Sequence, residues 1–413
     1  MKIQPVKGTK DFYPEEKALQ NYIFNIWRSI SLQYGFEEVD TPVLEPTEIY
    51  KKSGEEIPEQ LFSFKDKSER NIALRPETTP SIARMIASKN LTKPIKWFSI
   101  SKCFRYENPQ SGRTREFTQF NLDILGTKNM LADAEVISTA IKIMLSFKLT
   151  NKDFFVRISN RKLMESILVS FGLKESQLKI IYRLIDKICK ISEKDFKLTL
   201  KEYKLTDKQI KDVLELLKIK DFKKLEKYKL DKKGEEGLAE LKELFSYLKT
   251  FNLDKYCRLD LSIMRGFDYY TSTVFEVFDA KGEFRAIAGG GRYDNLLELF
   301  DAEPCPGVGY AMGDIVLTLF LKERNKLPEI KKGIDYYIAP VNEKLYKLSI
   351  EIAEKLRAEG NSVEIDLMNR NLGKQFNYAN SINAKKVIII GERDLPKVTI
   401  RDMATGKEEK KKI

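Results

Sequence analysis

The spacing of apolar residues near the start of the chain predicts a long amphipathic helix. Ile23, Trp27 and Ile30 recur at intervals of three or four residues, which places them on one face of a helix over residues 15–34. Gly35 follows directly, and glycine is favoured just after the last helical residue. This helix therefore has one face to bury against a core.

The pattern changes to that of strands between residues 97 and 125. Residues 97–103 and 118–125 are mostly apolar or β-prone, and Pro109 and Gly112 lie between these two runs, where they break strands. The pattern predicts a long antiparallel hairpin whose connecting loop is rich in arginine and glutamate.

Shorter runs fill the rest of the first three quarters of the chain, and one of them contains Pro42, which indicates an edge strand or a bend. Strands are predicted at 36–45, 62–65, 71–74, 154–158, 257–264, 271–279 and 284–288. Helices are predicted around 82–86 and over 132–148 and 314–321. Mostly antiparallel strands with helices between them are typical of an α+β fold.

The composition changes over residues 174–253, where Lys, Glu, Leu and Ile dominate with a helical period. We interpret this stretch as an α-helical insertion, whose charges form a solvated face or a basic surface for RNA. After a predicted linker at 326–333, strands and helices alternate and predict a βαβαββ domain over 334–413. The core domain would then span 1–325, and the lysine-rich end of the chain is expected to fray.

The composition limits the possible partners and location. The chain has 413 residues, of which 42% are hydrophobic and 32% charged, as in a globular protein with a sizeable core. A net charge of +12 suits a polyanion such as RNA, although a lysine-rich surface can also simply be solvated. No run approaches the roughly 18 apolar residues of a membrane span, and residues 1–8 lack the apolar core of a signal peptide. We therefore expect a cytoplasmic protein that makes no membrane contact.

The chain contains no histidine, which excludes Ser-His and Cys-His nucleophiles and any histidine-ligated metal. The cysteines Cys103, Cys189, Cys257 and Cys305 are far apart and form no CxxC pair. This spacing indicates reduced thiols in a cytosolic protein and not a disulfide framework or a zinc site. Any chemistry must rest on arginine, lysine, carboxylates, tyrosine, oxygen-held metal ions or the substrate.

The loop of the predicted hairpin carries groups that can bind a nucleotide. Arginine binds phosphate through paired hydrogen bonds, phenylalanine offers a stacking face, and a carboxylate accepts from an adenine amino group. A solvated hairpin with surface charges would have the same spacing. Glu77 and Thr79, at the start of a helix, are equally explained as capping residues. The glycine-rich runs at 289–291 and 307–313 match neither GxGxxG nor GxxxxGK[ST], so neither a Rossmann nor a Walker site is expected.

Four motifs carry a resemblance to a known family. Residues 104–107 (Phe-Arg-Tyr-Glu), followed by Arg113 and Phe117, resemble motif 2 of class II aminoacyl-tRNA synthetases. The other three resemble stretches of histidyl-tRNA synthetases: 74–79 (Leu-Arg-Pro-Glu-Thr-Thr), 265–270 (Arg-Gly-Phe-Asp-Tyr-Tyr) and 288–294 (Ala-Gly-Gly-Gly-Arg-Tyr-Asp). The motifs occur in the order of that family, and the C-terminal pattern resembles its anticodon-binding domain.

The resemblance implies that L-histidine is activated by ATP, with Mg²⁺ on the phosphates, to histidyl-adenylate and then transferred to the terminal adenosine of tRNA(His). It implies a class II antiparallel sheet flanked by helices, with an α-helical insertion and a C-terminal α/β anticodon-binding domain. It also implies a homodimer whose interface includes the helix at 15–34 and the strand at 36–45. It gives no metal site built from protein side chains.

The resemblance further assigns roles to single residues. ATP would be bound by Arg105 at the α-phosphate, Arg113 at the β- and γ-phosphates, Glu107 at the adenine amino group and Phe117 against the ring. L-Histidine would be bound by Glu77, Thr79, Gln119, Asp123, Arg265, Tyr269, Tyr270 and Tyr293, with Asp123 and Tyr270 at the imidazole. Arg105 and Arg265 would be the catalytic cations. Gln110 and Arg115 would contact the acceptor end of tRNA(His), including its extra 5′ nucleotide.

One position departs from the class II pattern. Motif 3 of the class usually ends in an arginine that lies against the adenine and the γ-phosphate, but residues 313–316 are Gly-Asp-Ile-Val, with Val316 at the arginine position. We expect Arg292 to supply the missing cation.

Two other functions fit parts of the sequence. The regulatory subunit of ATP phosphoribosyltransferase shares the synthetase fold without charging tRNA, but the complete ligand motifs and the C-terminal domain favour the synthetase. A non-catalytic RNA-binding protein would explain the charge of +12 alone.

Overall fold

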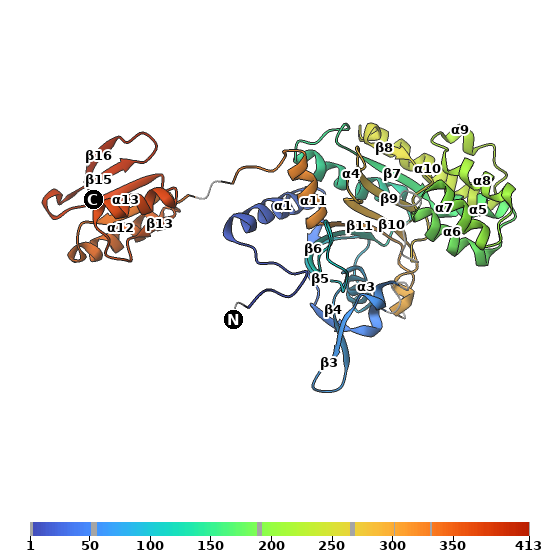
Figure 1. The fold of residues 1–413 in the computed structure, drawn as a ribbon, viewed down its shortest axis with the longest axis horizontal. Helices are drawn as coiled ribbons and strands as arrows, with labels where there is room; N and C mark the ends of the chain where they lie inside the picture. Colours follow the sequence, from blue (N-terminus) through green and yellow to red (C-terminus); the bar gives the residue numbers. More distant parts are fainter. Residues whose placement is uncertain are drawn as a thin grey trace. The chain divides into compact units, whose positions relative to one another are not determined.

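The computed structural model describes residues 3–50, 56–187, 192–264, 269–300, 302–330 and 333–412. The chain forms two compact units, an N-terminal unit of Met1–Leu327 and a C-terminal unit of Pro328–Ile413 (Figure 1).

The N-terminal unit is built on an eight-stranded sheet with the order β1-β5-β6-β11-β10-β9-β7-β8. Neighbouring strands from β5 to β7 are antiparallel, and only the outermost pairs, β1 with β5 and β7 with β8, are parallel. The strands are β1 (Glu37–Glu38), β5 (Ile95–Phe104), β6 (Glu116–Leu125), β7 (Phe154–Asn160), β8 (Cys257–Leu259), β9 (Thr273–Asp279), β10 (Ala288–Tyr293) and β11 (Gly307–Gly313). The predicted α+β class, with a mainly antiparallel sheet flanked by helices, is confirmed.

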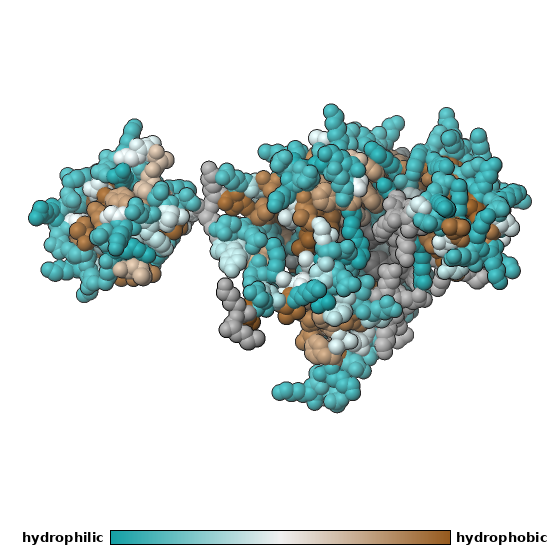
Figure 2. Space-filling view, viewed as in Figure 1, coloured by the Kyte–Doolittle hydropathy of each residue, from teal (hydrophilic) through white to brown (hydrophobic). Residues whose placement is uncertain are grey.

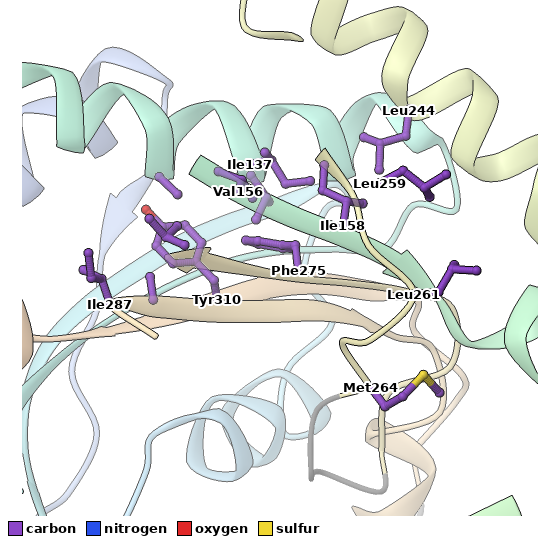
Figure 3. Packing of buried hydrophobic residues seen from close by; sticks show 14 of the residues in the cluster. Ile137, Val156, Ile158, Leu244, Leu259, Leu261, Met264, Phe275, Ile287 and Tyr310 are labelled. Carbon is purple, nitrogen blue, oxygen red and sulfur yellow. The ribbon is translucent and has the colours of Figure 1, made fainter. Parts of the chain in front are cut away.

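Helices α1 (Pro14–Gln33), α4 (Met130–Ser146) and α11 (Asp314–Glu323) pack on one face of this sheet (Figure 1). The apolar stripe of α1 is buried as predicted, and Trp27 stacks on Phe120 of β6 at a centroid distance of 5.3 Å. Figure 3 shows Ile137 of α4 packed with Val156 of β7 and Phe275 of β9. The opposite face of the sheet is thereby left for polar residues.

A separate three-stranded sheet has the order β2-β4-β3, and its strands come between β1 and β5 along the chain. Its strands are β2 (Leu44–Pro46), β3 (Phe62–Lys65) and β4 (Asn71–Leu74), and α2 (Glu56–Glu59), α3 (Thr79–Ala87) and the 3₁₀ turn η1 (Thr47–Tyr50) accompany it. The strand predicted at 36–45 with an interruption at Pro42 consists of two short strands, β1 and β2, with the predicted bend between them. The chain pairs with β5 through β1, crosses at Pro42, and joins the small sheet through β2. Proline has no N–H to donate, so it suits this crossing between sheets.

The glycine-rich segments are strands, which the sequence pattern missed. The strand predicted at 284–288 lies further along the chain than expected. Residues 284–287 precede β10, which includes Gly289, Gly290 and Gly291. A β-carbon at Gly290 would lie 2.1 Å from the carbonyl oxygen of Gly309 on β11. Glycine is therefore required here by the close approach of the two strands. The strand predicted at 257–264 is also shorter than expected, because β8 ends at Leu259.

The predicted helical insertion belongs to a larger helical module. Its helices are α5 (Arg161–Ser170), α6 (Glu175–Lys187), α7 (Glu193–Glu202), α8 (Asp207–Leu217), α9 (Phe222–Leu225) and α10 (Lys232–Thr250), followed by η3 (Asp254–Tyr256). Helix α10 packs on α4 and α5, and its Leu241, Leu244 and Leu248 join the main core. The face of the module that Figure 2 shows is mainly hydrophilic, with some apolar atoms between the polar ones.

The C-terminal unit has a five-stranded sheet with the order β13-β12-β14-β15-β16. Its elements are β12 (Tyr336–Pro340), α12 (Tyr346–Ala358), β13 (Val363–Ile365), α13 (Leu372–Ser381), β14 (Lys386–Ile390), β15 (Lys397–Asp402) and β16 (Glu408–Lys412), with the 3₁₀ turns η5 (Glu343–Leu345) and η6 (Glu392–Asp394). The expected frayed tail was wrong, because β16 pairs with β15. The Asp402 carboxylate accepts from the backbone N–H of Ala404 and Thr405 and so forms the turn.

Candidate active site

A cavity of about 810 Å³ opens on the face of the large sheet that faces away from α1 and α4. It is lined by β6, β10 and β11, by the start of α3, by the loop between β5 and β6, and by the loop between β9 and β10. These elements are far apart in sequence, so the sheet order brings their residues together.

Strand β6 forms the floor of the cavity through its two-residue period. Phe117, Gln119, Asn121 and Asp123 alternate along the strand and all line the cavity. The intervening residues face the core, where Phe120 contacts Trp27. One strand thus presents an aromatic ring at its outer end and a buried carboxylate at its inner end.

Asp123 is buried at the inner end of the site, with 2% of its surface exposed, the same fraction as for Glu77 and Tyr293. The Tyr293 hydroxyl donates to Asp123 Oδ1 at 2.5 Å, and Asp123 Oδ2 has no hydrogen-bond partner among the described residues. A β-carbon at Gly309, the residue opposite Asp123 on β11, would lie 1.9 Å from Oδ1. Gly309 therefore makes the space that this carboxylate occupies.

Burial raises the pKa of Asp123 to about 7. The nearby Glu77 charge also raises this pKa, whereas the hydrogen bond from Tyr293 lowers it. A carboxylate with a pKa near neutrality can accept a hydrogen bond from a ring N–H and can also share a proton with it. A neutral imidazole carries one N–H donor and one nitrogen acceptor, so it can donate a hydrogen bond to such a carboxylate or share a proton with it.

Tyrosine rings wall this inner end of the cavity. Tyr269 lies 4.9 Å from Tyr270 and 5.9 Å from Tyr293 between ring centroids. Gly291 lies against the Tyr270 ring, where a β-carbon would come within 2.9 Å. The glycines of β10 and β11 thus admit both the Asp123 carboxylate and the aromatic wall.

Glu77 and Thr79 reach the same cavity from the start of α3, and both are buried. The N-cap of this helix is Thr78, whose side chain makes no cap hydrogen bond. The Thr79 hydroxyl accepts from Asn121 Nδ2 at 3.5 Å, across to β6. These contacts contradict the interpretation of Thr79 as a capping residue and place its hydroxyl at the cavity wall.

The outer end of the cavity is rich in guanidinium groups. Arg105 Nε donates to the Pro76 carbonyl at 3.0 Å, and the Arg105 guanidinium lies 5.2 Å from the Phe117 ring centroid. Arg113 Nε pairs with Glu107 Oε2 at 2.9 Å. Arg105, Glu107, Arg113 and Phe117, predicted together for ATP, do line one region.

Gln110 and Arg115 do not line the cavity. Gln110 pairs with Arg113 in an isolated bridge at the loop. Arg115 Nε donates to the Glu107 carbonyl at 3.1 Å, and its guanidinium lies 4.2 Å from the Tyr106 ring centroid. This stacking holds the Arg115 side chain outside the lining of the cavity.

Arg265, the second predicted catalytic cation, lies outside the described residues. The residues that flank it are fixed by Arg161 at the start of α5. Arg161 donates to the carbonyl of Met264 at 2.9 Å through Nη2 and to the carbonyl of Tyr270 at 2.9 Å through Nη1. Arg161 therefore links Met264 to Tyr270.

The prediction that Arg292 replaces the motif 3 arginine was wrong. Arg292 is 2% exposed and donates to Asp133 of α4, with which it forms a buried ion pair. It also donates to the Thr127 carbonyl at 2.9 Å and pairs with Asp294 at 3.4 Å. These partners lie away from the residues that line the cavity, so Arg292 fastens β10 to α4.

Three of the cavity residues that the sequence interpretation missed carry an amide or a guanidinium group. Asn121 shares the parity of Gln119 and Asp123 on β6, so the two-residue period could have found it. Arg157 of β7 and Arg285 of the β9–β10 loop line the cavity as well, but no local pattern marks them. Only the strand order of the sheet brings them to the site.

Within the described ranges, no three Cys, Asp or Glu side chains form a group that could hold a metal ion. Likewise, none of the described helices is both long and apolar enough to cross a membrane.

Comparison with known proteins bears on this geometry. A family model described as histidyl-tRNA synthetase matches residues 8–314, and a model described as anticodon binding domain matches residues 335–413. The chain belongs to the histidyl-tRNA synthetase family. The first match covers the large sheet with its cavity, and the second covers most of the C-terminal unit.

Relatives within this family align along the whole chain. The histidine–tRNA ligase of Pyrococcus furiosus is 40% identical over 100% of this chain and 97% of its own length. The chloroplastic/mitochondrial histidine–tRNA ligase of Arabidopsis thaliana is 36% identical over 98% of this chain and 84% of its own. The crystal structure of histidyl-tRNA synthetase from Nostoc sp. PCC 7120 matches with a TM-score of 0.82 and 25% identity, covering 100% of this chain and 97% of that one. The predicted fold and family are therefore confirmed.

Proposed function

We propose that this protein is a histidine–tRNA ligase, which activates L-histidine with ATP and transfers it to tRNA(His). The observation that carries the proposal is the division of one cavity in a histidyl-tRNA synthetase fold. Its inner end has a buried carboxylate among tyrosines, and its outer end has guanidinium groups beside an aromatic ring.

The imidazole of histidine would occupy the inner end. Asp123 Oδ2 accepts the ring N–H, and the Tyr270 hydroxyl serves the other ring nitrogen. Glu77 and Thr79, with the buried Gln119, then face the α-ammonium group. A site that hydrogen-bonds a polar group can reject analogues that lack it by about 10⁴–10⁵. Tyr269 and Tyr293 would close the pocket around the ring.

ATP would occupy the outer end as its magnesium complex, with Mg²⁺ bound to the phosphates. Phe117 stacks on the adenine and Glu107 accepts from its amino group, while Arg105 and Arg113 bind the α-phosphate and the β- and γ-phosphates. The contact between Arg105 and Phe117 supports this arrangement, because it puts a phosphate-binding cation next to a stacking surface.

In the first step, the ionised carboxylate of histidine attacks the α-phosphorus of ATP. A carboxylate–phosphorus bond forms, the bond to the β-phosphate oxygen breaks, and pyrophosphate leaves with the electron pair. Arg105 and Arg265 stabilise the added charge on the α-phosphate oxygens. No general base is needed, because an α-carboxylate is already ionised at neutral pH. A chain without histidine can therefore carry out the step.

In the second step, a ribose hydroxyl of the terminal adenosine attacks the carbonyl carbon of the adenylate. An ester forms and AMP leaves, while a phosphate oxygen of the adenylate accepts the hydroxyl proton. Gln110 and Arg115, on the loop outside the cavity, would contact the acceptor end of tRNA(His). The C-terminal unit, which matches an anticodon-binding model, would bind the anticodon end.

The proposal includes a homodimer and a cytoplasmic location. Exposed apolar side chains on the two segments expected at the interface support the dimer: Leu32 on α1, and Val43 and Leu44 at β2. Apolar side chains left exposed on a monomer can be covered by a partner subunit.

The experiment that tests the proposal is amino-acid-dependent exchange of labelled pyrophosphate into ATP, carried out with each of the twenty amino acids. Histidine alone should support exchange. Aminoacylation of tRNA(His) transcripts, with and without the extra 5′ nucleotide, then tests the second step, and loss of charging without that nucleotide would support a contact at the loop.

The same assays separate the alternatives. A regulatory subunit of ATP phosphoribosyltransferase would charge no tRNA, and a plain RNA-binding protein would show no exchange but salt-sensitive binding to many RNAs. Histidine-dependent exchange followed by charging contradicts both.

A further inference from the structure

We propose that Arg285 is a third phosphate-binding arginine of the ATP site and supplies the cation that position 316 lacks. The inference deepens the proposed function and rests on it, since it assigns one more residue to ATP in the same reaction.

Arg285 lies in the loop between β9 and β10 and lines the cavity together with Arg105 and Arg113. Desolvation lowers its pKa, and the Arg113 and Arg105 charges lower it further, while Glu107 raises it. The three guanidinium groups are therefore close enough to act on one another electrostatically, with the Glu107 carboxylate among them. A local group of three cations favours a polyanion over a neutral ligand.

Arg285 differs from the other cavity arginines in its contacts. Arg105 donates to a backbone carbonyl, Arg113 pairs with Glu107 and Arg157 pairs with Asp260. Within the described part of the chain, Arg285 makes no hydrogen bond and no ion pair. A guanidinium that faces a cavity with its donors uncommitted suits a phosphate, which it can bind through two parallel hydrogen bonds.

The loop that carries Arg285 is exposed, but hydrogen bonds and ion pairs hold it in place. The Asp279 carboxylate accepts from the backbone N–H of Lys281 at 3.1 Å and of Glu283 at 2.9 Å. Arg324, just after α11, pairs with Asp279 and with Glu283, the latter at 3.3 Å. These contacts preorganise the loop, as a phosphate-binding cation requires.

The same helix α11 positions Arg285 and carries Val316. Phe284, next to Arg285, packs edge-on against Phe320 of α11 at a centroid distance of 5.8 Å. Val316 lines the cavity, and its Cγ2 would lie 3.5 Å from a β-carbon at Gly112 in the β5–β6 loop. An apolar side chain offers nothing to a phosphate at that point. Arg285 enters the same cavity from a loop packed on the same helix.

The test is the KM for ATP in histidine-dependent pyrophosphate exchange, compared between the wild type and Arg285→Ala. Loss of one charged hydrogen-bonding partner should raise the KM for ATP by about 10- to 100-fold and leave the KM for histidine nearly unchanged. Arg285→Lys, which keeps the charge without the planar fork, should lie between the two. Lys281→Ala is the matched control, because it removes one cation from the same loop outside the cavity lining.

A KM for ATP within about twofold of the wild type in both Arg285 variants would overturn the proposal, as would an effect confined to the KM for tRNA during aminoacylation. Far-UV circular dichroism and thermal unfolding of each variant exclude misfolding as the cause. If the wild type itself showed no exchange with histidine, the proposed function would fail, and this outcome differs from a silent Arg285 variant of an active enzyme.

A second variant tests whether positions 285 and 316 serve the same ligand. Val316→Arg in the Arg285→Ala background should recover part of the lost ATP affinity, because it returns a guanidinium to the cavity from α11. Further loss of ATP affinity in the combined variant would contradict a shared phosphate.

Discussion

The two ends of the cavity use opposite physical means. The outer end keeps its guanidinium groups at least partly accessible to solvent, and their attraction for a polyanion is long-range and sensitive to salt. The inner end buries Asp123 among tyrosines, and its polar atoms include Gln119 Oε1, which has no hydrogen-bond partner among the described residues. A buried polar atom is costly unless it is paired, so the inner end is selective for a ligand that supplies the pairing.

This difference teaches where affinity and specificity should reside. Charge at the outer end should determine how tightly ATP binds and how fast the α-phosphate reacts. Hydrogen bonding at the inner end should determine which amino acid is accepted. Substitutions at the two ends should therefore change different kinetic constants.

The largest effect is expected for Arg105→Ala. Removing one preorganised donor from a site of developing charge costs about 10²–10³ in kcat. The kcat of pyrophosphate exchange should fall by that amount, with little change in the KM for histidine. A fall confined to histidine binding would contradict the assignment of Arg105 to the phosphate end.

Asp123→Asn should act on the other substrate. The variant keeps the shape of the side chain but cannot carry the charge, so the KM for histidine should rise by about 10- to 100-fold, while the KM for ATP stays the same. An equal rise in both constants would mean that the two ends of the cavity do not act separately.

Gly309→Ala probes the space that Asp123 occupies. A β-carbon 1.9 Å from Asp123 Oδ1 must displace the carboxylate, and overpacking of this kind costs about 1–3 kcal/mol in stability. The KM for histidine should rise more than the KM for ATP, and the melting temperature should fall. Gly112→Ala, beside Val316 in the β5–β6 loop, is a poorer control because its φ of +75° is itself strained for alanine. Gly313→Ala is better, since no heavy atom lies within 4 Å of its β-carbon.

The smallest effect is a shift in pH dependence for Tyr293→Phe. The Tyr293 hydroxyl lowers the pKa of Asp123, which burial raises to about 7, so removing the hydroxyl should raise that pKa further. Histidine binding that needs the ionised carboxylate should then reach half its maximum at a higher pH. The measurement is the pH profile of kcat/KM for histidine, and a profile that does not move would contradict the role of Asp123.

The same shift predicts the sign of a stability change. With a raised pKa in the folded state, Asp123 retains a proton that the unfolded chain loses above pH 3.8. Its contribution to the free energy of unfolding is therefore present at low pH and is lost as the pH rises through about 7. The melting temperature of the wild type should therefore fall relative to that of Asp123→Asn as the pH rises from 5 to 8.

The β5–β6 hairpin was predictable because its signals are local. Alternating apolar residues and a Pro/Gly-rich loop predicted it, and the resemblance to motif 2 grouped Arg105, Glu107, Arg113 and Phe117, which do line one region. The pairing of β5 with β6 along ten residues of each strand bears this out.

The glycine-rich strands and Arg292 were not predictable in the same way. Glycine weakens a strand pattern. Gly290 is needed because β11 approaches it closely, and Gly309 is needed because the Asp123 side chain lies against it, and only the strand order creates these contacts. Arg292 follows a glycine run next to the site in sequence, but its side chain meets Asp133 on α4. We predicted that Arg292 supplies the missing motif 3 cation because it lies near the site in the sequence, and the ion pair with Asp133 contradicts this prediction.

The most direct test of the central claim uses the absence of histidine from the chain. With histidine labelled by ¹⁵N in the ring, every imidazole signal in a nuclear magnetic resonance spectrum of the complex belongs to the ligand. The account predicts a bound imidazole in one tautomer, with its N–H shifted by a hydrogen bond in the wild type and lost or unshifted in Asp123→Asn. A bound signal that is the same in both proteins would contradict the assignment of the buried end to the imidazole.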